Sequence, residues 1–178
     1  MTRLIRRFDT ADATDERLAA IRQLLDRAFA GDFSDDDWEH TLGGTHVVAE
    51  HGDEVIAHAA VVRRTIHAAG RSFDAGYVEG VATEPGRQGQ GFGGRVMAEV
   101  GEIVRNEFEL GTLSTSRHRF YERLGWERWR GQTSVRRGTS VVRTPDEDDG
   151  VMVLRIGPSR DLDLGTEITC EARRGDDW

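Results

Sequence analysis

Apolar residues recur along the chain with two periods, one typical of a helix and one typical of a strand. The helical period extends to about residue 30, at Leu18, Ile21, Leu25, Ala28 and Phe29. Asp12 or Thr14 could cap the start of this helix, and Gly31 follows its end. A second, short helix is expected after Ser34, a capping residue that three aspartates follow.

The strand period, in which apolar residues alternate, fills much of the remaining chain. It predicts strands at residues 4–8, 46–50, 54–62, 64–69, 72–82, 110–114, 134–142, 151–156 and 167–172. The turns at 51–53 and 70–71 would join neighbouring strands as hairpins. Two more helices are expected at 95–108 and 120–124. We therefore expect a single α+β domain over residues 1–178, with a central mixed, mostly antiparallel sheet flanked by helices.

The composition fits one domain of 178 residues and 19.9 kDa. The chain has no apolar run of the roughly 18 residues that a spanning helix needs, and its start has no apolar core of signal-peptide length. A lone cysteine, Cys170, rules out an internal disulfide and favours a reducing compartment. We expect a cytoplasmic protein that does not bind membranes.

Charge narrows the possible partners. The net charge of −8 argues against nucleic acid and favours a cationic partner. All 24 basic residues are arginine, so chemistry that depends on lysine is excluded. The six histidines lack metal-ligand spacing, and we expect no metal.

The stretch GQGFGG at residues 89–94 matches the G-x-G-x-x-G pattern of a dinucleotide-binding turn. Its context does not fit, because the preceding strand ends near residue 82, Pro85 intervenes, and hairpins precede it where a parallel crossover is required. A P-loop would need a lysine. A mobile linker is a poor alternative, because the glycines lead directly into a helix. A pyrophosphate-binding turn at a helix N-terminus remains.

The segment from Gln88 to Gly93, QGQGFG, resembles the Q/R-x-x-G-x-G/A signature of the GCN5-related N-acetyltransferases (GNAT), and FYERLGW at 120–126 resembles a second feature of that superfamily. The resemblance implies the GNAT fold and acetyl-coenzyme A as cosubstrate. Six further segments resemble the aminoglycoside 2′-N-acetyltransferases: GDFSDDDWEHTLGGTH, AHAAVV, GYVEGVA, LGTLSTS, RTPDEDDG and GDDW.

This second resemblance implies direct acetyl transfer to the 2′-amine of an aminoglycoside antibiotic, and so antibiotic resistance. Glu79 would be the general base, through a water, and Tyr121 would protonate the departing thiolate. The backbone of Val81 would hold the thioester. The pyrophosphate would bind to Gln88, Gly89, Gly91, Gly93 and Gly94. The antibiotic would bind to Asp32, Asp37, Gly80, Ser114, Asp148, Asp176 and the Trp178 carboxylate, with Glu147 as an alternative to Asp148.

Several of these residues could instead have purely structural or solvent-exposed roles. An amine is protonated at neutral pH and needs a base before it attacks a thioester, but Glu79 could equally be a solvated strand residue. Tyr121 could be a packing residue, and the acidic run at 146–149 could be a solvated loop. At the level of function, the acceptor could be another cellular amine, or the protein could be a non-catalytic acyl-coenzyme A sensor. A homodimer is possible.

Overall fold

The computed structural model describes residues 3–52 and 54–178. The chain forms two compact units. The first contains Met1–Val62 and Val78–Glu102, and the second contains Arg63–Tyr77 and Ile103–Trp178. Strands β3 (Glu54–Ala68) and β4 (Arg71–Thr83) each contribute residues to both units. That residues 1–178 act as a single domain stays a prediction, and the two units are described in turn.

The helices of the first unit begin at polar caps. Helix α1 (Asp15–Ala28) starts after Thr14, whose hydroxyl accepts the backbone N–H of Arg17 at 3.3 Å. Asp12, the alternative cap, lies in a short 3-10 turn, so Thr14 is the cap. Helix α2 (Asp35–Thr41) starts after Ser34 as expected.

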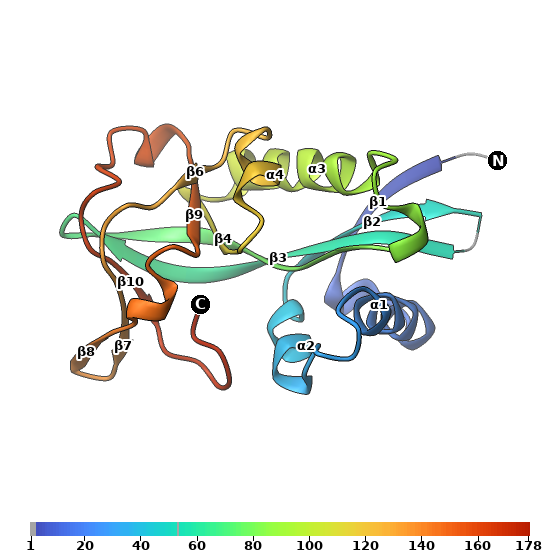
Figure 1. Cartoon of the computed structure of the whole chain (residues 1–178), viewed down its shortest axis with the longest axis horizontal. Helices are drawn as coiled ribbons and strands as arrows, with labels where there is room; N and C mark the ends of the chain where they lie inside the picture. Colours follow the sequence, from blue (N-terminus) through green and yellow to red (C-terminus); the bar gives the residue numbers. More distant parts are fainter. Residues whose placement is uncertain (1–2, 53) are drawn as a thin grey trace. The chain divides into compact units, whose positions relative to one another are not determined.

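The strands of the first unit form an antiparallel meander. Strand β1 (Arg3–Asp9) pairs with β2 (Thr45–His51), which pairs with the first part of β3. The expected turn between β2 and β3 includes residue 53, which lies outside the described residues. In Figure 1, α1 and α2 lie on one side of β2 and β3. The core of this unit is apolar and is built from Ile21, Leu24, Leu25, Phe33, Val48, Val55 and Ala82.

Helix α3 (Phe92–Glu107) begins three residues earlier than residue 95, where the sequence places its start. Glycine lowers helix propensity, so the sequence assigned Gly93 and Gly94 to a loop. Phe92 is buried, and this packing anchors the first helical turn in spite of the glycines. The amide donors at the start of the helix therefore follow the glycine turn directly.

The second unit is a mixed sheet. Strand β5 (Leu110–Ser114) runs parallel to the Ala75–Tyr77 part of β4. The other elements of this unit are α4 (His118–Glu122), β6 (Glu127–Arg128), β7 (Thr133–Arg137), β8 (Ser140–Arg143), β9 (Val151–Arg155) and β10 (Ile168–Glu171). Strand β9 pairs antiparallel with β5 and β6, and β10 pairs parallel with β7 and antiparallel with the end of β3.

Three strand predictions were wrong in detail. The runs at 54–62 and 64–69 form the single strand β3, because no turn residue separates them. The run at 134–142 folds into a hairpin of β7 and β8, in which Gly138 takes the φ of +61° that a tight turn requires. Strand β6 was not predicted, because two residues are too few to show an alternating apolar pattern.

The predicted fold class is confirmed, since a mixed and mostly antiparallel sheet is accompanied by helices. The strand order is β6-β9-β5-β4-β3-β10-β7-β8. Strand β2 also pairs with β3, and β1 pairs with β2. Across residues 3–52 and 54–178, none of the helices has the length and apolar character needed to cross a membrane.

Candidate active site

The end of β4 in the first unit carries three predicted site residues, Glu79, Gly80 and Val81, all partly exposed. Gly80 has a φ of +57°, and a Cβ at this position would lie 2.9 Å from the Thr41 side chain. Both facts require glycine here. The backbone therefore departs from regular strand geometry immediately after Glu79.

Gly80 is the end of a chain of hydrogen-bonded side chains, in which His46 and His58 are buried and Thr10 is partly exposed. The Nδ1 atom of His58 lies 2.7 Å from the Gly80 carbonyl oxygen, and its Nε2 lies 2.9 Å from His46 Nδ1. His46 Nε2 lies 2.9 Å from the Thr10 hydroxyl. Burial lowers the pKa of His46 to about 4 and that of His58 to about 3, so both rings are neutral at pH 7. The spacing of the histidines in the sequence gives no signal for this chain, because His46 and His58 lie on different strands.

The glycine turn follows β4 in the same unit. Gly89 and Gly91 have φ values of +75° and +84°, and a Cβ at either position would meet nothing within 4 Å. Gln88 is exposed, and its side-chain amide contacts the Thr83 carbonyl at 3.5 Å. Gly93 and Gly94 lie in the first turn of α3, a turn with no acidic residue. The turn thus presents open backbone at the start of a long helix, as an anion site requires.

The two predicted substrate carboxylates of this unit differ in their surroundings. Asp32 is exposed in the connection between α1 and α2. Asp37 accepts the backbone N–H of Ser34 at 2.9 Å, while its own backbone N–H donates to the Ser34 hydroxyl at 3.0 Å. Asp37 therefore completes the capping box that begins α2, which is a structural role beside the proposed contact with substrate.

The second unit brings Ser114 and Glu147 together. The Ser114 hydroxyl donates to Glu147 Oε2 at 3.0 Å. Burial raises the pKa of the Glu147 carboxyl. The hydrogen bond from Ser114 opposes this shift, and the negative charge of Asp176 adds to it. Gly150 permits this approach, because a Cβ there would lie 2.8 Å from Ser114 Oγ.

Asp148, the next residue along, has a different set of contacts. Its carboxylate binds the Arg143 guanidinium at 2.8 and 3.0 Å and accepts the Thr133 backbone N–H at 2.8 Å. The hydrogen bond from Arg143, then that from Thr133, lowers the pKa of Asp148 far below its ordinary value. These contacts join the loop before β9 to β7 and β8.

The C-terminal segment is held in place rather than frayed. The Trp178 side chain is 5% exposed, and its indole N–H donates to Thr144 Oγ1 at 3.1 Å. The Cys170 thiol donates to the Asp177 carbonyl at 3.3 Å, and Arg173 donates to the Trp178 terminal oxygen at 3.3 Å. The terminal carboxylate therefore has a defined position, with the exposed Asp176 beside it.

Tyr121 lies on α4 in the second unit, 7% exposed and edge-on to Trp126. Burial raises the pKa of its phenol to about 12, opposed by the nearby Arg117 charge and a side-chain hydrogen bond with Thr115. The hydroxyl is therefore protonated at neutral pH and can donate a proton.

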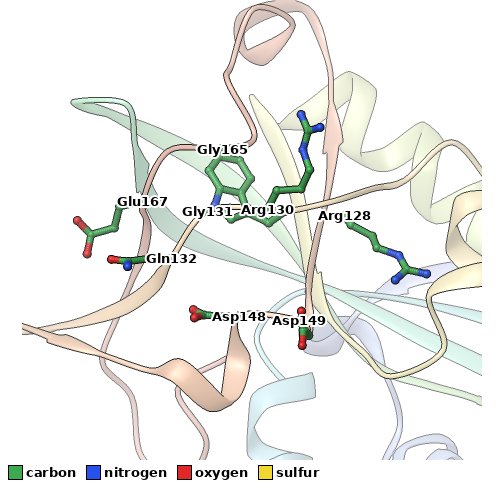
Figure 2. A pocket seen from close by; sticks show the side chains of 9 residues that line it. Arg128, Arg130, Gly131, Gln132, Asp148, Asp149, Gly165 and Glu167 are labelled. Atoms are coloured by element: carbon green, nitrogen blue, oxygen red, sulfur yellow. The ribbon is translucent and has the colours of Figure 1, made fainter.

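One cavity of about 630 Å³ opens in the second unit. Figure 2 shows its labelled lining, which includes the carboxylates of Asp148 and Asp149 near the start of β9. Asp148 is the one predicted site residue in this lining, and its carboxylate is already bound to Arg143. Within residues 3–52 and 54–178, His, Cys, Asp and Glu side chains form no group of three that could hold a metal.

The chain is similar to known proteins of one family. A family model described as an acetyltransferase (GNAT) domain matches residues 9–129. The chain belongs to the GNAT acetyltransferases, and the superfamily resemblance seen in the sequence is confirmed. It is also 42% identical, over 95% of its own length and 89% of the relative, to an aminoglycoside 2′-N-acetyltransferase of Mycolicibacterium fortuitum. The second, narrower resemblance is thereby confirmed as well.

Two solved structures show the fold. The GNAT acetyltransferase YhbS of Escherichia coli, crystallised with coenzyme A, is 16% identical and superposes with a TM-score of 0.66 over 94% of this chain and 89% of its own. A GCN5-related N-acetyltransferase of Kribbella flavida is 26% identical, with a TM-score of 0.58 over 74% of this chain. This chain spans only 34% of that longer protein.

Proposed function

We propose that this enzyme transfers the acetyl group of acetyl-coenzyme A to the 2′-amino group of an aminoglycoside, directly and without a covalent enzyme intermediate. The observation that carries the proposal is the succession in the first unit of Glu79 on β4, the glycine turn with two positive φ angles, and the start of α3. The similarity to the Mycolicibacterium fortuitum enzyme supports the choice of acceptor.

The glycine turn fits the pyrophosphate of the cosubstrate. Left-handed Gly89 and Gly91 leave open space where side chains would otherwise stand. The first amides of α3 lack helical acceptors, and the helix dipole adds positive charge there. Gln88, Gly93 and Gly94 complete the proposed contacts. When bound, acetyl-coenzyme A supplies the activated acetyl group.

Glu79 is the proposed general base. An aminoglycoside amine is protonated at neutral pH and cannot attack until a base removes its proton. Glu79 is partly exposed, so a water can relay the proton to its carboxylate. The Val81 backbone N–H is the proposed donor to the thioester oxygen, where negative charge develops during transfer.

Tyr121 is the proposed general acid. Because burial holds its pKa near 12, the hydroxyl is protonated at neutral pH and can donate a hydrogen bond to the sulfur as negative charge develops on it. A departing thiolate, whose conjugate acid has a pKa near 8.5, is basic enough to share that proton in the transition state.

Carboxylates are the proposed contacts of the cationic acceptor, in agreement with the net charge of −8. In the acidic loop we favour Glu147 over Asp148, because Glu147 lies with Ser114 and Asp176 whereas Asp148 is neutralised by Arg143. The further proposed contacts are Asp32, Asp37, Gly80 and the Trp178 carboxylate.

We also propose the location of the enzyme in the cell and its oligomeric state. A cytoplasmic location would give it acetyl-coenzyme A and keep Cys170 reduced. A homodimer is supported by edge strand β8, where Val141 and Val142 are about half exposed. Light scattering on the purified enzyme tests the dimer.

The function is tested by thiol release from acetyl-coenzyme A with two matched acceptors. Kanamycin B has an amine at the 2′ position, and kanamycin A has a hydroxyl there. We expect rapid thiol release with the first and little with the second, with mass spectrometry placing the acetyl group on the 2′ nitrogen. Equal rates would contradict 2′ selectivity. Faster turnover of a cellular amine in direct competition would make the antibiotic a secondary substrate.

A further inference from the structure

Four groups of the first unit form a continuous hydrogen-bonded chain that ends on the backbone of β4, and the two groups at its centre are buried histidines. They are Thr10, His46 on β2, His58 on β3 and the Gly80 carbonyl, joined at 2.9, 2.9 and 2.7 Å. Both imidazole rings are 0% exposed. Buried polar side chains are costly unless every polar atom is satisfied, so such a chain needs a reason.

The terminal acceptor fixes the direction of every hydrogen bond in the chain. A carbonyl oxygen can only accept, so His58 Nδ1 carries a proton and donates to Gly80. Because His58 is neutral, its Nε2 must accept, and His46 Nδ1 must therefore donate to it. His46 Nε2 is then an acceptor for the Thr10 hydroxyl. Both rings are Nδ1–H tautomers.

Thr10 is built to supply that last proton. The Gly43 N–H donates to the Thr10 hydroxyl oxygen at 3.0 Å, which leaves its single proton to be given away. The hydroxyl has two acceptors within hydrogen-bond distance, the Gly44 carbonyl oxygen at 3.1 Å and His46 Nε2 at the shorter 2.9 Å. The hydroxyl proton can therefore point to His46.

The chain also fixes the peptide plane between Gly80 and Val81. This peptide is trans, so its C=O and N–H point in opposite directions. Holding the Gly80 oxygen toward the His58 ring directs the Val81 N–H away from that ring. The positive φ of Gly80 leaves this plane outside regular strand geometry, so the sheet alone does not determine its orientation.

We propose that His46 and His58 are positioning residues, which act through the Gly80 carbonyl to hold the Val81 N–H in the orientation that receives the thioester oxygen. This rests on the proposed function for the identity of the group that the N–H meets. A purely packing role would need only the shapes of the two rings. A positioning role needs the Nδ1 proton of His58.

The tautomers are tested first, on the wild-type protein and without any substrate. Long-range ¹H–¹⁵N spectra distinguish Nδ1–H from Nε2–H imidazole. We expect both His46 and His58 to be neutral Nδ1–H tautomers from pH 6 to 8. An Nε2–H tautomer at His58 would leave no donor for Gly80 and would overturn the proposal, whether or not the protein acetylates aminoglycosides.

The functional consequence is tested with two variants of matched shape. His58→Asn keeps an amide N–H close to the place of Nδ1, and His58→Leu has the same branching with no donor. With the folded fraction measured by circular dichroism, we expect His58→Leu to lower kcat on the order of tenfold to a hundredfold with a smaller change in KM for acetyl-coenzyme A. The kcat of His58→Asn should stay within about threefold of the wild-type value, because the amide keeps a donor for the Gly80 carbonyl.

Equal kcat values for the two folded variants would overturn the positioning role. Absence of turnover by the wild-type enzyme would instead reject the proposed function and leave the tautomer result standing. If both variants fail to fold, the wild-type spectra still test the proposal, since an Nε2–H tautomer at His58 would overturn it.

Discussion

The hydroxyl of Ser114 donates a hydrogen bond to Glu147 across 3.0 Å, from the last residue of β5 to the loop before β9. The next residue, Asp148, is bound instead to Arg143. Two adjacent carboxylates of one acidic run thus have different partners. Glu147 contacts β5 through Ser114, and Asp148 joins the loop to β7 and β8.

Replacing Glu147 should weaken acceptor binding. We expect Glu147→Gln to raise KM for the aminoglycoside about tenfold, the scale of one lost charge-assisted contact, and to change KM for acetyl-coenzyme A little. Steady-state kinetics with each substrate varied in turn measure this. The control is Asp146→Asn, an exposed carboxylate of the same loop, which should have no such effect. Equal effects of the two variants would mean that only the net charge matters.

Replacing Asp148 should act on stability. Asp148→Asn leaves Arg143 without its ionic partner and weakens the contact with Thr133, so we expect a lower melting temperature. Thermal unfolding measures this, with Asp149→Asn, an exposed neighbour, as the control. If folded Asp148→Asn lost acceptor affinity as strongly as Glu147→Gln, Asp148 would have to be returned to the site.

Removing the carboxylate of Glu79 should remove the base. We expect Glu79→Gln to lower kcat about 10²–10⁴-fold, the usual contribution of general-base catalysis, without changing the affinity for coenzyme A measured by calorimetry. The control is Glu54→Gln. Glu54 is an exposed strand residue of the same unit, and this variant should have the kcat of the wild type. An unchanged kcat in Glu79→Gln would remove Glu79 from the mechanism.

The left-handed glycine at position 91 should be required for cosubstrate binding. Gly91→Ala places a Cβ on a backbone with φ +84°, at a cost of about 1–2 kcal/mol. Gly138→Ala, at φ +61° and equally open, is the matched control for that strain. We expect similar losses of stability, but only Gly91→Ala should raise the Kd for acetyl-coenzyme A, by about tenfold, a loss of about 1.4 kcal/mol. Equal Kd values would argue against a phosphate contact at this turn.

Tyr121 should donate its proton over a wide pH range. Tyr121→Phe is expected to lower kcat by about 10²-fold, the lower limit for an acid catalyst, with little change in KM. Because the pKa of Tyr121 is about 12, its hydroxyl stays protonated below pH 10, so kcat should show no loss of this acid there. Tyr77→Phe, the other tyrosine, is the control and should keep kcat. A Tyr121-dependent fall in kcat between pH 8 and 9.5 would contradict the assignment.

The buried histidines should make the fold sensitive to acid. Their pKa values are lowered to about 4 and about 3 in the folded chain, against about 6.5 when unfolded, so the unfolded state binds more protons below pH 6.5. Their contribution to stability is therefore complete above pH 6.5 and is lost as pH falls toward 4. We expect the free energy of unfolding to drop by about 3 kcal/mol per pH unit in that window, for two protons. Urea unfolding at pH 7, 6 and 5 measures the slope, which His58→Asn should reduce by about half.

Local patterns were sufficient for much of the fold. The spacing of Leu18, Ile21 and Leu25 predicted α1, and Ser34 predicted the start of α2, because caps and amphipathic faces depend on neighbours in the chain. The same patterns failed where distant packing prevailed. Phe92 is anchored by burial, which moved the start of α3 into the glycines, and the turn at Gly138 divided one alternating run into β7 and β8.

The candidate site divides in the same way. The residues of VEGVA and of the glycine turn were found from the sequence, since each depends on a short motif on one strand and the loop behind it. The choice between Glu147 and Asp148 depends on which side chains from β5, β7 and β8 reach the loop, and no local pattern contains those contacts.

By itself the sequence determined the α+β class, the acetyltransferase family and the strand on which the chemistry is proposed. Only the tertiary structure decided that Trp178 is buried rather than frayed, that Asp148 is an ion-pair partner, and that His46 and His58 support Gly80. The physical reason is that a motif is written in adjacent residues, whereas a hydrogen bond between residues 58 and 80 exists only after the sheet has brought them within 2.7 Å.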